Sequence, residues 1–263
     1  MASEVREWNA EVYHRVSEPQ FNWGMAVLAR LELAGDESIL DAGCGSGRLS
    51  AELAGRLPRG RLIAVDRSLN MVAKARSELS ARASGRFLCL ASELGELAVE
   101  EGADGIFSTA TFHWVLDHPR LFRSLWRALR PGGWLEAQCG GGPNLARIHA
   151  HCERLISGAR FREFFGSFRE PWQFADPETT VRRLAEAGFV EARAWLEEAP
   201  ARFPDRGSFI EFVSHVVLRP YLALLPEASL REEFVNAVAV AAAADDPPFT
   251  LDYWRLNFRA RKT

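Results

Sequence analysis

The chain has 263 residues, of which 48% are hydrophobic and 25% charged, as in a globular protein and unlike a disordered one. This length can form one large domain, or one domain that carries a cap. The net charge of −3 and the pI near 6.1 exclude any general expectation of binding to nucleic acid or to an acidic membrane. No uncharged apolar run reaches the ~18 residues of a membrane span.

The cysteines indicate a reduced compartment. Cys44, Cys89, Cys139 and Cys152 form no C-x-x-C pair, so neither a zinc site nor a disulfide framework is expected. The N-terminus carries charges where a signal peptide needs an apolar stretch. We therefore expect a cytoplasmic protein without a metal, either a monomer or a homodimer.

Strands and helices alternate over the first 140 residues. Short buried runs that end at glycines or acids predict strands, and apolar residues that recur every four positions predict the helices between them. The predicted strands are 38–41, 61–66, 86–91, 104–108 and 134–138. The predicted helices are 48–57, one with Met71, Ala75 and Leu79 on its apolar face, and one that begins at Pro119 and is terminated by Pro131–Gly133. This order predicts right-handed crossovers and a parallel sheet that binds its ligand at the carboxyl ends of the strands.

The pattern changes after Gly142. Residues 143–187 are predicted to be helical and are rich in aromatic side chains, and two late strands are predicted at 190–203 and 251–261, with a helical stretch at about 207–244 between them. The late strands would complete a Rossmann-like α/β sheet of seven mostly parallel strands, with helices on both faces and a helical cap over the carboxyl ends of its strands. We divide the chain into an N-terminal helical segment (1–35), a sheet core (36–142), and cap insertions with the final strands (143–263).

A glycine loop follows the first strand. Gly43, Gly45 and Gly47 allow a tight turn and a close approach of backbone to ligand, and the helix that follows points amide donors at the ligand. Asp66 ends the second strand, where an acid can accept both hydroxyls of a ribose. In the dinucleotide pattern G-x-G-x-x-G, the third glycine would stand at position 48, but Arg48 is there instead. Asp41, before the loop, would repel a pyrophosphate but suits a cofactor that carries an ammonium and a sulfonium.

The segment Asp41-Ala-Gly-Cys-Gly-Ser-Gly47 resembles motif I of the class I S-adenosylmethionine (SAM)-dependent methyltransferases, and residues 36–140 resemble that family throughout. The resemblance implies that SAM is the cofactor and S-adenosylhomocysteine its product. It implies that Asp41 and the loop, Cys44 included, hold the methionine part and that Asp66 holds the ribose. Arg67 and Met71 would lie beside the adenine, and Thr109 would complete the cofactor site.

One position departs from the family. An Asp often follows the third strand there and binds the adenine amino group, whereas this chain has Ala91-Ser92-Glu93. Either Ser92 or backbone groups would accept that hydrogen bond.

The fourth strand leads to the expected substrate side. Ser108-Thr-Ala-Thr-Phe-His-Trp-Val115 is similar to segments of the trans-aconitate methyltransferases and of related carboxyl methyltransferases. Residues 13–23 are similar to the segment that folds over the cofactor in this group. The resemblance implies a small-molecule substrate. We take His113 and Trp114 as candidate catalytic residues. The candidate substrate-binding residues are Tyr13, Trp23, Trp172, Arg219, Tyr221 and Trp254.

The acceptor decides what His113 would do. A carboxylic acid titrates near ~4 and is already ionised at neutral pH, so His113 would donate a hydrogen bond to it. A phenol or alcohol needs a base poised near neutrality, and His113 is the evident candidate. We expect O-methylation of a small carboxylic acid, with Arg219 as a possible anchor for the anion; methylation of another metabolite with His113 as base is the alternative.

Three other functions stay open at this point. An NAD-dependent oxidoreductase is disfavoured by the glycine spacing and by Asp41. A non-catalytic SAM-binding regulator would predict decay of the loop or of Asp66, and both are intact. A methyltransferase that acts on RNA or protein is disfavoured by the acidic balance and the aromatic-rich cap.

Overall fold

A computed structural model describes residues 7, 10–82 and 86–263 of the chain, without the side chains of Val12, Tyr13 and Val16. It divides into two compact units. The first comprises residues 1–142, 172–197 and 256–263, and the second comprises residues 143–171 and 198–255. The polypeptide thus leaves the first unit after Gly142 and returns to it twice, so that each unit is assembled from segments distant in sequence.

The first unit is built on a seven-stranded sheet with the order β3-β2-β1-β4-β5-β9-β6. Its strands are β1 (Ser38–Ala42), β2 (Arg61–Asp66), β3 (Phe87–Ala91), β4 (Ala103–Thr109), β5 (Leu129–Gly140), β6 (Val190–Glu198) and β9 (Trp254–Arg261). The pairings of β1 with β2 and β4, of β2 with β3, and of β4 with β5 are all parallel. The mostly parallel α/β sheet predicted from the sequence is therefore confirmed.

One strand runs against the others. Near the end of β9, Lys262 donates its backbone N–H to Gly133 and accepts from Gly132, both at 2.9 Å, beside the beginning of β5. The other end of β9 lies beside the end of β5, because a Cβ on Gly141 would stand 2.5 Å from Leu256. The two strands are therefore antiparallel.

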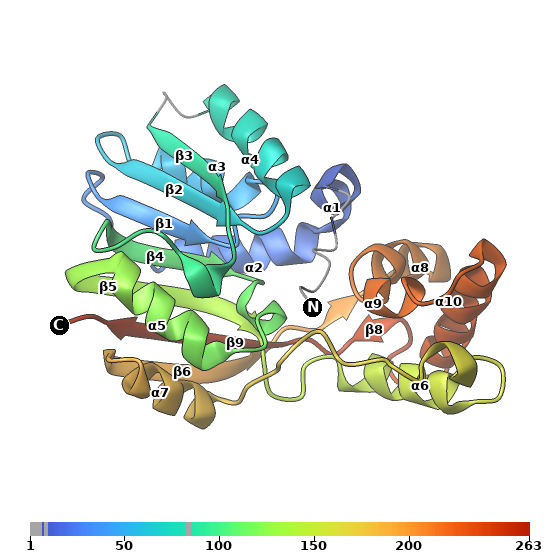
Figure 1. Cartoon of the computed structure of the whole chain (residues 1–263). Coiled ribbons are helices and arrows are strands. Elements are labelled where there is room, and N and C mark those ends of the chain that lie inside the picture. The colour runs from blue at the N-terminus through green and yellow to red at the C-terminus, as the bar shows by residue number, and fades with distance from the viewer. Residues whose placement is uncertain (1–6, 8–9, 83–85) are drawn as a thin grey trace. The chain divides into compact units, whose positions relative to one another are not determined.

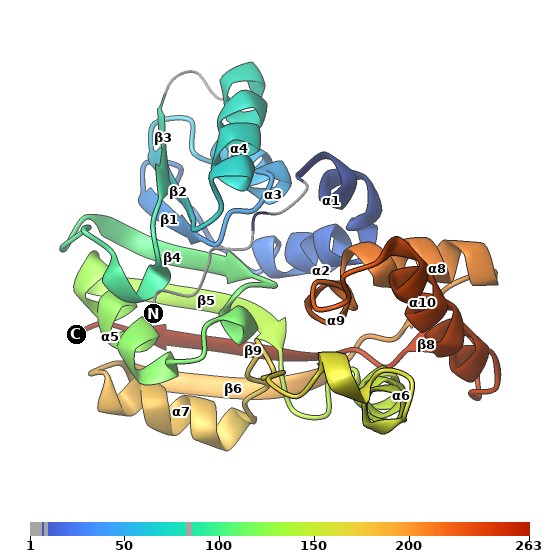
Figure 2. The ribbon, with the colours of Figure 1, turned by 45° about the vertical axis from the view of Figure 1, so that its right-hand side comes forward.

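Helices cover both faces of this sheet (Figures 1 and 2). One group of helices packs with an apolar core that includes Leu28, Leu53 and Leu79, and its members are α2 (Glu18–Leu28), α3 (Arg48–Gly55) and α4 (Leu69–Arg82). The other group packs with a core that includes Leu125 and Leu184, and its members are η1 (Leu94–Glu96), α5 (His118–Ala128) and α7 (Pro177–Glu186). The short helices α1 (Ala10–Val16) and η2 (Phe112–Trp114) complete the unit.

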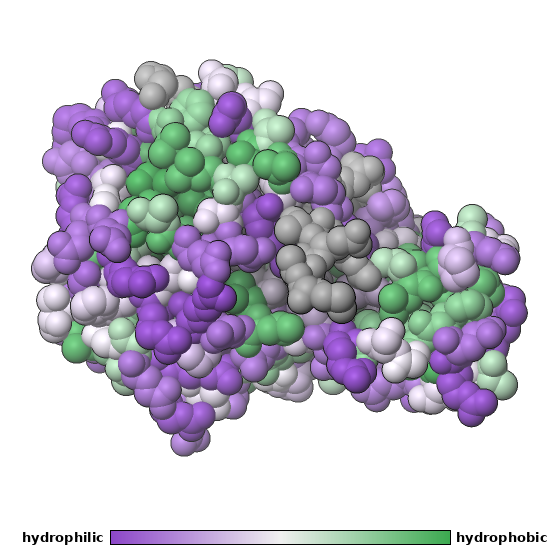
Figure 3. Space-filling model, viewed as in Figure 1, coloured by the Kyte–Doolittle hydropathy of each residue, from purple (hydrophilic) through white to green (hydrophobic). Residues whose placement is uncertain are grey.

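Apolar side chains also reach the surface over β3 (Figure 3). This strand ends the sheet order, and Leu88 in it is 50% exposed. No helix in the described part of the chain is long and apolar enough to cross a membrane.

The second unit is mainly helical. It contains α6 (Ala146–Ser157), η3 (Arg162–Phe164), α8 (Arg206–His215), α9 (Arg219–Leu222) and α10 (Ala228–Ala243), with an antiparallel pair of short strands, β7 (Ala201–Arg202) and β8 (Thr250–Leu251). Aromatic rings fill its interior: Phe165, Tyr221 and Phe234 pack with centroids 5.8 to 6.2 Å apart.

Several predicted boundaries were wrong. Helix α5 ends at Ala128, and Pro131–Gly133, predicted to terminate it, lie inside β5. The two late strands each divide, because β7 and β8 leave the large sheet and pair with each other. The stretch 158–176, predicted to be helical, contains only the short η3. Its aromatic residues pack by tertiary contacts, which the helical interpretation did not consider.

Candidate functional site

The glycine loop turns sharply against the end of β2. The backbone N–H groups of Gly43 and Cys44 both donate to the carbonyl of Val65, at 2.8 and 2.9 Å. Gly43, Gly45 and Gly47 have φ values of +88°, +53° and +85°, which L-residues rarely adopt. A Cβ added to Gly45 would meet nothing within 4 Å, so this backbone faces open space that a ligand can enter.

Asp66 stands beside this loop at the end of β2. Its carboxylate accepts the N–H of Gly45 at 3.0 Å and that of Ser68 at 2.9 Å. Burial raises the pKa of Asp66, and the hydrogen bonds from Ser68 and Gly45 oppose that rise because they stabilise the charged form. The arrangement holds one carboxylate in place next to the open backbone of Gly45.

Asp41 lies behind the loop and is only 2% exposed. Its carboxylate accepts a hydrogen bond of 2.6 Å from the Ser50 hydroxyl. Burial raises the pKa of Asp41 to about 7, the Ser50 bond opposes the rise, and the charge of Asp66 adds to it. A carboxyl group in this position keeps a proton far more readily than a surface carboxyl does.

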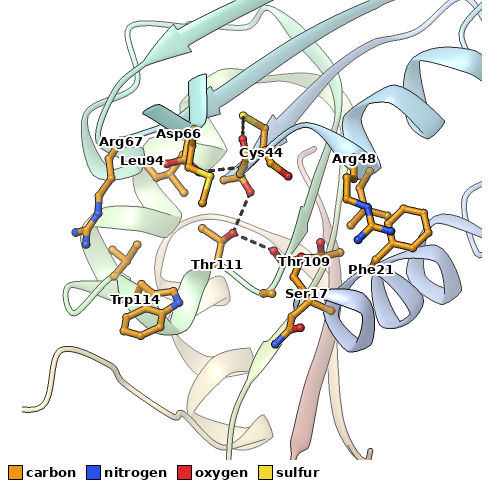
Figure 4. A pocket seen from close by; sticks show the side chains of 18 of the residues that line it. Ser17, Phe21, Cys44, Arg48, Asp66, Arg67, Leu94, Thr109, Thr111 and Trp114 are labelled. Carbon is orange, nitrogen blue, oxygen red and sulfur yellow. Dashed lines mark hydrogen bonds between the residues drawn. The ribbon is translucent and has the colours of Figure 1, made fainter. Parts of the chain in front are cut away.

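These elements surround a pocket with about 1010 Å³ of empty space, open solvent included. Arg67 and Trp114 lie at one end of it, and Arg48 and the ring of Phe21 lie at the other (Figure 4). The Arg48 guanidinium stands 4.1 Å from the centroid of that ring.

The segment that follows β4 forms one wall of the pocket, and side-chain and backbone hydrogen bonds hold it in place. The Thr111 hydroxyl lies within hydrogen-bond distance of the carbonyls of Gly43 (3.1 Å) and Thr109 (2.9 Å), which ties the wall to the glycine loop (Figure 4). Thr111, Trp114 and Val115 line the pocket, whereas His113 is not among its lining residues. Beside Trp114, the Nδ1 atom of His113 accepts the backbone N–H of Gly140 at 3.3 Å. A neutral His113 therefore carries its hydrogen on Nε2 and presents a donor there.

Comparisons with known proteins agree with this geometry. A family model described as a methyltransferase domain matches residues 40–137. A trans-aconitate 2-methyltransferase of Variovorax paradoxus is 33% identical over 239 residues, which cover 88% of this chain and 89% of that protein. The chain belongs to the class I SAM-dependent methyltransferases. A trans-aconitate 2-methyltransferase of Deinococcus radiodurans is 28% identical over 231 residues, 84% of each chain.

Solved structures share the fold of this methyltransferase. Phosphoethanolamine N-methyltransferase 2 of Haemonchus contortus, in complex with phosphomonomethylethanolamine and S-adenosylhomocysteine, superposes with a TM-score of 0.61 at 18% identity. The match covers 96% of this chain and 56% of that one. The [4+2]-cyclase SpnF superposes with a TM-score of 0.60 at 19% identity, over 92% of this chain and 80% of its own. At such identities the likeness concerns the fold alone.

Most of the predicted cofactor residues of the methyltransferase meet in the pocket. The ones that line it are Gly43, Cys44, Gly45, Asp66, Arg67, Met71 and Thr109. Asp41 and Gly47 are not among the lining residues: Asp41 bonds Ser50, and Gly47 precedes α3 and packs against Ala75. Ser92 does not line it either; its hydroxyl donates to the carbonyl of Glu93.

The predicted substrate residues are spread over the molecule. Trp172 belongs to the first unit and packs edge-on against Trp114, with centroids 6.2 Å apart. Trp23 is half-buried in α2 and is not among the lining residues, and the side chain of Tyr13 lies outside the described part of the structure.

The remaining three belong to the second unit. Tyr221 is a core residue there, stacked on Phe168 at 4.8 Å. Arg219 is half-buried at the start of α9, and the backbone N–H of Trp254 donates to Asn144 at 3.0 Å. Packing inside the second unit therefore accounts for the position of Tyr221.

Residues 13–23 were predicted to fold over the cofactor, but only Tyr13 and Trp23 of this segment were named as site residues. Ser17, the residue before α2, and Gln20 and Phe21 within it line the pocket, and their spacing of three and four residues puts them on one side of the helix start. Gln20 is 9% exposed, and its Oε1 has no hydrogen-bond partner among the described residues. The resemblance of residues 13–23 to a cofactor-covering segment was the available signal. Glu93 and Leu94 were also missed, although they directly follow Ser92.

Among the described residues, no group of three or more His, Cys, Asp or Glu side chains could hold a metal ion.

Proposed function

We propose that this methyltransferase uses SAM to O-methylate the carboxylate of a small acid. The names of its relatives, trans-aconitate 2-methyltransferases at 28% and 33% identity, support the acceptor class. The observation that carries the proposal is the hydrogen bond from the Gly140 N–H to Nδ1 of His113. Because Nδ1 accepts this bond, the hydrogen of a neutral ring is on Nε2, which then has no lone pair to act as a base.

The pocket suits SAM. When bound, SAM supplies an electrophilic methyl group on a sulfonium. The loop backbone at Gly45 faces open space, and the adjacent Asp66 carboxylate can accept ribose hydroxyls. The unpartnered Oε1 of Gln20 offers an acceptor for a donor group of the bound molecule.

The remaining cofactor roles follow from position in the pocket. We assign the loop at Gly43 to the methionine part, and Arg67 and Met71 to the adenine, with Glu93 and Leu94 replacing Ser92 there. Asp41 would act through the loop that it supports.

The acceptor wall, which we define as residues 111–115, would orient the acid. A carboxylate is ionised at neutral pH, so no side chain has to remove a proton. Nε2–H of His113 would donate to one carboxylate oxygen, and Trp114, whose indole N–H is only a donor, would form the wall beside it. Alignment of the two reactants and exclusion of water would then supply much of the acceleration, on the order of 7–11 kcal/mol.

The alternative acceptor is a hydroxyl group, with His113 as general base. A base needs Nε2 without a hydrogen. In a neutral ring the hydrogen would then be on Nδ1, where it would point at the N–H of Gly140. The same hydrogen bond that favours a carboxylate therefore disfavours this alternative.

Two substitutions of His113 separate the two chemistries. His113→Gln keeps a donor but no base, whereas His113→Ala keeps neither. For carboxylate methylation we expect H113Q to stay within about 10-fold of the wild-type kcat/KM and H113A to lose about 10- to 100-fold, both with unchanged SAM affinity. The assay follows methyl transfer to trans-aconitate, other small acids and matched phenols from pH 6 to 9.

General base catalysis predicts a different result. Both variants would then lose about 10²- to 10⁴-fold, and wild-type activity would rise with pH as an imidazole loses its proton. Turnover of phenols with none of acids would overturn the proposal.

A further inference from the structure

The turn η2 carries the acceptor wall. Two of its successive backbone carbonyls accept hydrogen bonds from residues outside the turn. The carbonyl of Phe112 accepts Nε2–H of His118 at 3.1 Å. The carbonyl of His113 accepts the backbone N–H of Gln173 at 2.7 Å. His118 begins α5, and Gln173 belongs to the segment that re-enters the first unit at Trp172. The position of the turn thus depends on residues up to 60 positions away.

Arg183 joins these two supports. Its Nη1 atom lies 2.9 Å from Nδ1 of His118 and 3.0 Å from Oε1 of Gln173. A guanidinium group only donates, so Nδ1 of His118 accepts and its hydrogen is on Nε2, where it reaches the carbonyl of Phe112. Arg183, half-buried in α7, therefore fixes the tautomer of His118 and the orientation of the Gln173 side chain.

The state of His118 agrees with this assignment. The ring is 2% exposed. Burial lowers the pKa of His118 to about 4, the bond to Phe112 opposes that change, and the charge of Arg183 lowers the pKa further. A neutral ring is what the network needs, because a protonated Nδ1 would face the guanidinium.

The two aromatic residues that flank Gln173 contact the wall. On one side of Gln173, Trp172 meets Trp114 edge-on, with centroids 6.2 Å apart. On the other side, Phe174 lies 5.8 Å from the ring of His113 at an interplanar angle of 36°. The segment 172–174 therefore contacts both candidate catalytic side chains while its centre is bonded to the turn and to Arg183.

We propose that Arg183 is a positioning residue for methyl transfer, which acts through His118 and Gln173 to orient His113 and Trp114 toward the acceptor. The inference rests on the role proposed above for the acceptor wall. A guanidinium that only stabilised the fold would affect the whole unit, whereas a positioning residue affects the wall and spares the glycine loop.

The test compares Arg183→Met, Arg183→Lys and Gln173→Ala with a matched control, Arg182→Met. Arg182 is the exposed neighbour of Arg183 on α7, where it pairs with Glu186 at 4.0 Å. The full chain is labelled with ¹⁵N-histidine and saturated with S-adenosylhomocysteine, and imidazole spectra are recorded against pH. This measurement needs no acceptor.

In the wild type we expect His118 to stay neutral down to about pH 4 and His113 to show one tautomer with hydrogen on Nε2. In R183M, His118 titrates at a higher pH, and the His113 signals shift or average between tautomers. Q173A changes His113 but leaves His118 neutral, R183K restores part of the wild-type spectrum, and R182M matches it.

The kinetic arm uses an acid turned over in the screen above. We expect R183M to raise the acceptor KM by about 10-fold, R183K to recover part of it, and the SAM dissociation constant to change less than twofold. Unchanged His113 signals in R183M would overturn the proposal. A parallel loss of SAM affinity and thermal stability in every Arg183 and Gln173 variant would also overturn it. If no acid is turned over, the proposed function fails, and the His113 spectra still decide the role of Arg183.

Discussion

One side of the pocket is formed by backbone groups and the other by side chains. The glycine loop presents backbone groups, with three glycines at positive φ and Asp66 bonded to Gly45. The acceptor wall presents side chains, and these are held by residues from β5, α5, α7 and the segment around Gln173. One contiguous motif is enough for the first side, whereas the second side forms only after residues up to 60 positions away have packed against it. Substitutions on each side should therefore differ in kind.

The largest effect is expected from Gly43→Ala. A Cβ at this position would stand 2.2 Å from the side chain of Thr111, on a backbone with φ of +88°. We expect a loss of about 3 kcal/mol or more in the free energy of unfolding, from strain together with overpacking, and at least about a 100-fold loss in SAM affinity, since the loop has to move.

Gly132→Ala is the matched control for this substitution. Gly132 also has a positive φ, +79°, but its Cβ would meet nothing within 4 Å. It should cost only about 1–2 kcal/mol and leave SAM binding unchanged. Urea unfolding and calorimetric titration with SAM measure both effects. Equal losses in the two variants would show that the contact with Thr111 is unimportant.

A smaller effect, which depends on pH, is expected behind the loop. The pKa of Asp41 is about 7 in the folded protein against an ordinary value of 3.8. Between these values the unfolded chain loses this proton and the folded one keeps it, so the contribution of Asp41 to stability falls as pH rises from about 4 to 7. The pKa difference corresponds to at most about 4 kcal/mol.

Asp41→Asn should remove this part of the pH dependence. The comparison is the free energy of unfolding of wild type and variant from pH 4 to 8, with the two curves diverging over that window. Curves that stay parallel would show that Asp41 does not titrate in the folded protein as its burial implies.

The smallest effect is expected from Trp172→Leu. Loss of an edge-on aromatic pair costs about 0.5–1.5 kcal/mol beyond burial, so we expect the acceptor KM to rise about 3- to 10-fold while SAM affinity stays unchanged. Trp195→Leu, which removes a ring that contacts Arg30 in the same unit, serves as the control. A loss of SAM affinity in W172L would remove the distinction between the two sides of the pocket.

The sequence by itself determined the alternating strands and helices, the parallel order and most of the glycine-loop side of the pocket. These features are local: a strand, a glycine turn and a helix stand within ten residues of one another, and Asp66 follows at the next strand end. Periodicity and backbone sterics therefore reveal them without any long-range contact. Family membership followed from the same motif.

Tertiary structure decided the rest. Periodicity did not show that the late strands divide into β6, β7, β8 and β9, because partners distant in sequence choose which residues pair. Asp41 was predicted at the ligand and lies behind the loop, whereas Gln20, which lies in the predicted segment 13–23 but was not named as a site residue, lines the pocket. The tautomer of His113 is set by the N–H of Gly140, and its backbone is held by Gln173. Such hydrogen bonds join positions 27 and 60 residues apart, and only the folded chain brings them together.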